Sequence, residues 1–124
     1  MRPRILVLDD EESIRQLLSV FFEGKGFEVA ALGTAKEAME SADRGRFDVA
    51  IFDVNLAGEN GLELLRYFKT NFPKLPVIIL TGLPDVDDLR DQAMFREANG
   101  FMRKTEPLDN LFEVVKSYVR LPAT

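Results

Sequence analysis

Short apolar runs rich in β-branched residues alternate along the chain with longer stretches of helical spacing. The apolar runs lie at residues 5–8, 27–32, 49–52, 77–80 and 101–102. Alternation of this kind is typical of βα units, which assemble into a parallel sheet. Runs that are apolar at every position, such as residues 77–80, indicate central strands that helices cover on both faces. We therefore predict an α/β fold built on a five-stranded parallel sheet.

Five helices are predicted between and after these strands, from apolar side chains spaced three and four residues apart. In the first helix the apolar face consists of Ile14, Leu17, Leu18, Phe21 and Phe22. The other helices are predicted at about residues 34–43, 62–72, 85–98 and 107–121. A chain of 124 residues is the size of one ordinary domain, so we expect residues 1–124 to form a single domain.

The composition excludes several kinds of chemistry, because the sequence contains neither cysteine nor histidine. Disulfides, thiolate zinc sites, cysteine nucleophiles, Ser-His-Asp triads and phosphohistidine are all ruled out on this chain. Any chemistry must therefore use carboxylates, hydroxyls or lysines.

Charge and hydropathy also limit the partners and the compartment. The formal net charge of −5 provides no long-range attraction to nucleic acid. The apolar run at residues 5–8 is too short for a signal peptide or a membrane span. We expect a cytoplasmic domain that binds neither nucleic acid nor membranes directly.

Polar side chains follow four of the predicted strands, at the point where each strand ends. They are Asp9, Asp10, Asp53, Thr81 and Lys104. In an open parallel sheet, ligands bind outside the carboxyl ends of the strands, where the strand order reverses. Taken singly, each residue has a plain explanation as a helix cap, a turn residue or a solvated lysine. Their coincidence at successive strand ends favours a functional site.

Three carboxylates at one edge repel one another unless a cation shares the site. Oxygen ligands from carboxylates and carbonyls are those that Mg²⁺ prefers. Asp53 could then act as a nucleophile that forms an acyl phosphate, with Thr81 and Lys104 binding the phosphoryl oxygens. The residues themselves thus predict magnesium-assisted phosphoryl transfer.

The motifs resemble the receiver domain of two-component response regulators, and the resemblance covers essentially the whole chain. The matching segments are ILVLDDE at residues 5–11, FDVNL at residues 52–56, GLE at residues 61–63, LTG at residues 80–82, and Phe101 three residues before Lys104. The resemblance implies a flavodoxin-like, doubly wound sheet with strand order 2-1-3-4-5. It also implies a phosphorylation-dependent signalling switch rather than an enzyme with a diffusing substrate.

The resemblance assigns a phosphoacceptor and a Mg²⁺ site. Asp53 matches the aspartate that accepts a phosphoryl group from a sensor histidine kinase or a phosphotransfer protein. Asp10, Asp53 and the backbone carbonyl of Asn55 match the Mg²⁺ ligands. Asp9 matches the second acidic residue, which usually acts through water.

The resemblance also assigns the residues that respond to phosphorylation. Thr81 matches the hydroxyl that turns toward the phosphoryl group, and Lys104 matches the ammonium that binds it. Phe101 matches the aromatic switch residue, although a plain core aromatic in the last strand is an alternative interpretation. The partners implied are an effector domain or a downstream protein, and a homodimer is compatible with the resemblance.

Four positions depart from the family pattern. The family usually has proline at the position of Ala57, commonly alanine at Gly82 and glycine at Glu97, and most often proline at Thr105. In the family the bond after the lysine is typically a cis peptide bond to proline. Without proline, a cis bond costs about 3–4 kcal/mol. We therefore predict a trans bond between Lys104 and Thr105, with the lysine amine still reaching the site.

Two alternative functions are weighed against the switch. A phosphohydrolase with an aspartyl nucleophile is suggested by Asp53-Val54-Asn55. Such enzymes usually need a second aspartate at the position of Asn55, which cannot donate a proton, and a cap domain. A pure interaction module that is never phosphorylated is the other alternative, and its mark would be loss of an acidic residue or the lysine.

Overall fold

The computed structural model describes residues 2–53, 61–82 and 98–119. Five parallel strands form one sheet in the order β2-β1-β3-β4-β5, which confirms the predicted topology. The strands are β1 (Arg4–Leu8), β2 (Glu28–Leu32), β3 (Val49–Asp53), β4 (Val77–Thr81) and β5 (Gly100–Arg103). The helices are α1 (Glu12–Gly24), α2 (Ala35–Arg44), α3 (Gly61–Asn71) and α5 (Leu108–Tyr118).

Each predicted strand is present, with ends that differ from the prediction by one residue at most. The capping box at the start of the second helix is also confirmed. The Glu37 amide donates to the Thr34 hydroxyl oxygen, and that hydroxyl donates to the Glu37 carboxylate. The helix predicted at about residues 85–98 lies, up to residue 97, outside the described residues.

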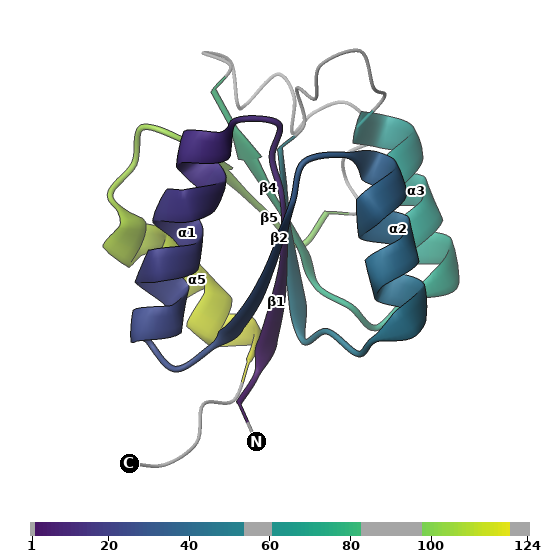
Figure 1. Cartoon of the computed structure of the whole chain (residues 1–124), viewed down its shortest axis with the longest axis horizontal. Coiled ribbons are helices and arrows are strands. Elements are labelled where there is room, and N and C mark those ends of the chain that lie inside the picture. Colours follow the sequence, from purple (N-terminus) through teal and green to yellow (C-terminus); the bar gives the residue numbers. More distant parts are fainter. Residues whose placement is uncertain (1, 54–60, 83–97, 120–124) are drawn as a thin grey trace.

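Helices cover both faces of the sheet: α1 and α5 lie on one face, and α2 and α3 on the other (Figure 1). Side chains alternate between these faces along β1, as expected for a strand. Ile5 and Val7 join the core on the α1/α5 side, whereas Leu6 and Leu8 join the core on the α2/α3 side. All four are fully buried, so the strand is apolar at every position because both of its faces are covered.

The predicted apolar face of α1 is only partly correct. Leu18 and Phe22 are buried, but Leu17 is 50% exposed. The buried positions recur at intervals of four residues, which places Leu17 at the border of that stripe rather than in it. No helix in the described ranges is long and apolar enough to cross a bilayer.

Strand register brings the predicted site residues to one edge. Leu8 pairs with Phe52, so Asp9 follows β1 beside the end of β3, which carries Asp53. The Asp9 amide continues the ladder on the other side by donating to Leu32 O at 3.1 Å. The strand order reverses at β1, with β2 on one side and β3 on the other. This is the edge at which ligands of open α/β sheets bind.

Candidate functional site

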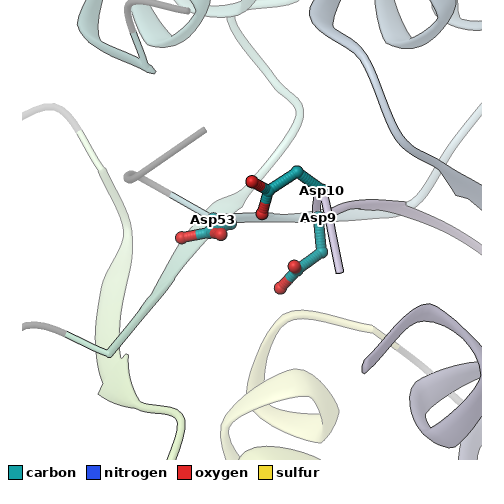
Figure 2. Close-up of side chains that lie close together, drawn as sticks. All are labelled: Asp9, Asp10 and Asp53. Carbon is teal, nitrogen blue, oxygen red and sulfur yellow. The ribbon is translucent and has the colours of Figure 1, made fainter. Parts of the chain in front are cut away.

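Three aspartates gather at the carboxyl edge of β1 and β3. The candidate ligand oxygens of Asp9, Asp10 and Asp53 lie within 4.8 Å of one another (Figure 2). Asp9 is 1% exposed and Asp53 is 2% exposed, whereas Asp10 is exposed. The structure therefore brings together all three predicted acidic residues, two of them buried.

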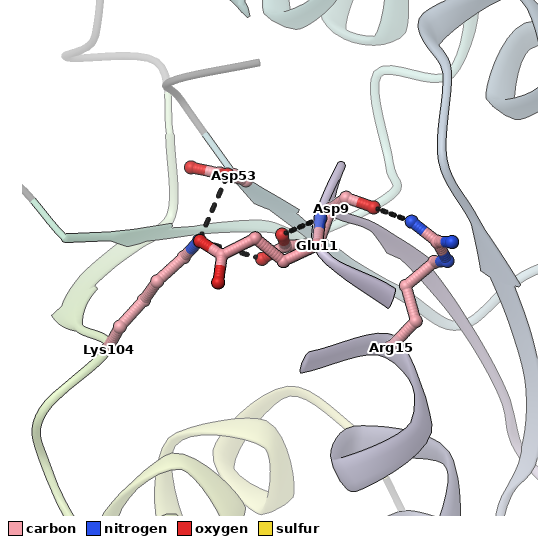
Figure 3. A network of polar contacts seen from close by, with 5 residues as sticks. All are labelled: Asp9, Glu11, Arg15, Asp53 and Lys104. Atoms are coloured by element: carbon pink, nitrogen blue, oxygen red, sulfur yellow. Dashed lines mark hydrogen bonds and ion pairs between the residues drawn. The ribbon is translucent and has the colours of Figure 1, made fainter. Parts of the chain in front are cut away.

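Lys104 reaches into this cluster from the loop after β5. Its Nζ atom lies 3.0 Å from Asp9 Oδ2 and 3.0 Å from Asp53 Oδ2. A third carboxylate, that of Glu11, lies 3.1 Å from the same atom (Figure 3). The Lys104 side chain is 14% exposed, so its ammonium is a largely desolvated counter-ion to the cluster. The prediction that this amine reaches the site is confirmed.

The surroundings of the cluster raise the pKa values of Asp9 and Lys104. Burial raises the pKa of the Asp9 carboxyl above its ordinary value, and the charge of Asp53 adds to that effect. The Glu11 amide and Lys104 oppose it without cancelling it. Burial alone would lower the pKa of the Lys104 ammonium, but its contacts with Asp9, Asp53 and Glu11 raise it overall. The Lys104 side chain is therefore charged at neutral pH. Burial of the charged Asp9 carboxylate costs free energy of folding.

The backbone after β5 places Lys104 beside the cluster. The described residues contain no cis peptide bond, so the bond between Lys104 and Thr105 is trans, as predicted. The Glu106 amide donates to Arg103 O at 3.1 Å, which closes a turn before α5 begins at Leu108. The turn itself contains no proline, and Pro107 follows it as the N-cap of α5.

Thr81 and Phe101 occupy neighbouring strands near the cluster. Thr81 is the last residue of β4 and pairs with Arg103 in β5. Phe101 is half-buried and packs against the core on the α2/α3 side.

A Cβ atom at Gly82 would lie 3.8 Å from Lys104 Cδ, an ordinary contact, so the alanine common in the family would also fit. Asn55 lies outside the described residues, as do the departures at positions 57 and 97.

Two residues of the site were given no role by the sequence. Glu11 binds Lys104, and Arg15 donates from Nη1 to the Asp9 carbonyl oxygen at 2.7 Å (Figure 3). Both lie at or just before the start of α1, where charged side chains are usually solvated. In the sequence alone, Glu11 is the last residue of the matching segment at residues 5–11 and has no assigned role, and Arg15 is distinguished only by its proximity to Asp9 and Asp10.

The described residues fit a divalent cation. Asp9 Oδ2 is buried and, although it lies at ion-pair distance from Lys104, it accepts no hydrogen bond from a described group. The three carboxylates offer oxygen ligands close enough together to share one ion. Mg²⁺ takes oxygen ligands, usually one or two of them carboxylates, and keeps several waters. Asp9, Asp10 and Asp53 are therefore the described residues that could hold it.

We expect Asp9→Asn to stabilise the metal-free domain, because the folded state holds the charged form of Asp9 at a cost. The folded pKa of Asp9 is raised above 3.8, so this cost is absent at low pH and appears as pH rises through the folded pKa. The gain should therefore be largest near neutral pH, on the order of 1 kcal/mol, a typical effect of one substitution. Urea unfolding in EDTA, at several pH values, measures it.

Mg²⁺ provides the control for this prediction. The wild-type domain should become more stable as Mg²⁺ is added, because a ligand that binds only the folded state stabilises it. The Asp9→Asn variant should gain less. A variant that is less stable than wild type in EDTA at neutral pH would contradict the prediction.

Comparison with known proteins points to one family. A sequence model described as the response regulator receiver domain matches residues 5–116. The DNA-binding response regulator MtrA of Mycolicibacterium smegmatis is 33% identical over 89 residues, covering 72% of this chain and 39% of MtrA. The response regulator PilR of Pseudomonas aeruginosa is 32% identical over 120 residues, covering 97% of this chain and 27% of PilR. The chain thus spans less than half the length of these relatives.

Solved structures agree with the sequence comparison. The response regulator TrrA of Thermotoga maritima, in complex with Mg²⁺ and BeF, superposes with a TM-score of 0.86 at 29% identity. The superposition covers 94% of this chain and 99% of TrrA. A complex of TrrA with the histidine kinase ThkA matches at a TM-score of 0.84, covering 94% and 98% of the two chains. With this fold and an acidic cluster at the expected edge, the chain belongs to the response regulator receiver domain family.

Proposed function

We propose that the chain, over residues 1–124, is a single cytoplasmic receiver domain that acts as a phosphorylation-dependent switch. Asp53 accepts a phosphoryl group from the phosphohistidine of a histidine kinase or phosphotransfer protein. The observation that carries the proposal is the contact of the Lys104 ammonium with Asp53, 3.0 Å away, beside two further aspartates. A buried carboxylate with one desolvated cation and a candidate metal site is equipped for phosphoryl transfer.

The roles proposed for the acidic residues are those that the resemblance to receiver domains implies. Asp10, Asp53 and the backbone carbonyl of Asn55 would hold Mg²⁺, with Asp9 acting through water. When bound, the ion would neutralise the negative charge that builds up as a phosphoryl group approaches the carboxylates. The similarity to TrrA, whose structure contains Mg²⁺ and BeF, supports this choice of cofactor.

The transfer itself uses this chain's own groups. A carboxylate oxygen of Asp53 forms the new bond to phosphorus while the bond from phosphorus to the donor nitrogen breaks. Lys104 pairs with a phosphoryl oxygen, and it is already held within 3.0 Å of the acceptor. The Thr81 hydroxyl donates to a second phosphoryl oxygen, and Phe101 turns inward with it. A phosphoryl group that contacts two conformations differently shifts the population between them.

The relatives support a proposal for the partners of this domain. TrrA is seen bound to the histidine kinase ThkA, and MtrA is a DNA-binding response regulator of more than twice this chain's matched length. We infer that this domain receives its phosphoryl group from a kinase of that class and passes the signal to an effector domain or a downstream protein. Homodimer formation belongs to the same proposal.

A small acyl phosphate donor distinguishes the switch from a phosphohydrolase. With Mg²⁺, intact-mass measurement should show one labile phosphoryl adduct per chain, and EDTA should prevent its formation. An added phosphomonoester should not be turned over. Repeated turnover of that ester would favour the phosphohydrolase, and no adduct with any donor would favour the pure interaction module.

A further inference from the structure

Arg15 of α1 binds the backbone of the loop after β1 and lies close to Gly33, which follows β2. Its guanidinium Nη1 donates to the Asp9 carbonyl oxygen at 2.7 Å. The Asp9 amide in turn donates to Leu32 O at 3.1 Å. Figure 3 shows Arg15 reaching Asp9 from α1, on the side away from Lys104. Both backbone polar groups of Asp9 are therefore fixed, one by a strand and one by a side chain.

Gly33 leaves the space that the guanidinium needs. A Cβ atom built at Gly33 would lie 3.0 Å from Arg15 Nη1 and 3.4 Å from Cζ. The first distance is shorter than ordinary van der Waals contact, so a side chain at residue 33 would require the guanidinium to shift by a few tenths of an ångström. The geometry joins Arg15 and Gly33, which are far apart in the sequence, into one arrangement around the Asp9 carbonyl.

The carbonyl that Arg15 binds belongs to the peptide unit that leads into Asp10. The Asp9 carbonyl and the Asp10 amide belong to one planar peptide unit, so holding the carbonyl also holds the Asp10 N and Cα atoms, from which its side chain starts. Asp9 and Asp53 are buried and both contact Lys104, whereas Asp10 is exposed. The position of this backbone therefore contributes to the placement of the Asp10 carboxylate within 4.8 Å of the other ligand oxygens.

We propose that Arg15 is a positioning residue for the cation site, acting through the Asp9–Asp10 peptide and not through its charge. This rests on the proposed function, because it assigns Mg²⁺ to the acidic cluster. The two modes of action predict effects of opposite sign. A nearby positive charge repels Mg²⁺, so if charge dominated, its removal would tighten binding. If positioning dominates, removal weakens binding, since ligands out of place lose affinity.

The test uses Arg15→Met, which keeps an apolar stem and removes the guanidinium. Titration of the domain with Mg²⁺ alone, followed by calorimetry, should give a dissociation constant raised about tenfold, the lower end of the range for groups that orient metal ligands. Arg15→Lys, which keeps the charge and can donate one hydrogen bond, should fall between wild type and Arg15→Met. Tighter binding by Arg15→Met, or Arg15→Met equal to wild type, would overturn the proposal.

Gly33→Ala tests the same geometry without touching Arg15. The added methyl should shift the guanidinium by a few tenths of an ångström and weaken Mg²⁺ binding in the same direction, by less than Arg15→Met does. Gly24→Ala is the matched control, because a Cβ atom there has no atom of the described chain within 4 Å. A Gly33→Ala domain that binds Mg²⁺ as tightly as wild type would argue against the proposal.

A measurement in EDTA separates this inference from the proposed function. The Asp10 amide in metal-free Arg15→Met should show a shifted resonance and a lower ¹⁵N heteronuclear NOE than in wild type. A merely structural role for Arg15 would lower the unfolding temperature and leave this local order intact. An unchanged Asp10 amide overturns the positioning role even if wild type is phosphorylated. Absence of a phosphoryl adduct in wild type would instead contradict only the proposed function.

Discussion

Substitution of Asp53 by asparagine is expected to abolish the phosphoryl adduct completely. Asparagine has almost the same shape as aspartate, but its amide lacks the anionic oxygen that attacks phosphorus. Asp53 is 2% exposed and lies against Lys104, so the structure provides this carboxylate with a cation. Intact-mass measurement after reaction with a small acyl phosphate and Mg²⁺ should show the adduct in wild type only.

Asp43→Asn is the control for this substitution. Asp43 is exposed in the last turn of α2, where it accepts a hydrogen bond from Tyr67. It is not one of the clustered carboxylates. The control domain should form the adduct at the wild-type rate. If Asp53→Asn still carries a full adduct, the acceptor is another residue, and peptide mapping would identify it.

Replacing Asp10 with alanine is expected to weaken Mg²⁺ binding at least about tenfold, which corresponds to about 1.4 kcal/mol. Asp10 supplies one of the three clustered carboxylates, and a Mg²⁺ site uses only one or two of them. Loss of one therefore removes a large share of the protein's contacts to the ion. Phosphorylation at limiting Mg²⁺ should slow by a similar factor and recover as Mg²⁺ is raised.

Glu12→Ala separates ligation by Asp10 from the general effect of negative charge. Glu12 is an exposed acidic residue in the first turn of α1, and it is not one of the clustered carboxylates. The Glu12→Ala domain should bind Mg²⁺ nearly as tightly as wild type, because exposed charges are screened. Equal losses in Asp10→Ala and Glu12→Ala would show that diffuse charge, and not a ligand, accounts for the binding.

The sequence predicted the site because the apolar runs show where each strand ends. A run such as residues 49–52 must be a strand buried on both faces, so Asp53 had to lie at its carboxyl end. The same reasoning placed Asp9 and Lys104 at that edge, and the structure brings all three together. The trans bond before Thr105 was predictable from the energetic cost of its alternative.

Other features depend on tertiary structure and could not be predicted in this way. Nothing in the spacing distinguishes buried Asp9 from exposed Asp10, because their difference arises from the direction of one loop. Arg15 resembles any solvated charge on a helix until the Asp9 carbonyl is placed beside it. Leu17 is half-exposed because the width of a helix's buried stripe depends on its neighbours.

An NMR comparison of the free domain with the domain in Mg²⁺ and beryllofluoride decides most directly whether the chain is a switch. Beryllofluoride resembles a phosphoryl group in shape and charge, and the relative TrrA has been solved in complex with Mg²⁺ and BeF. The proposed switch predicts amide shift changes at Thr81 and Phe101 and along β5 and α5, in addition to those at Asp9, Asp10 and Asp53. Changes confined to the three aspartates and their immediate neighbours would contradict it.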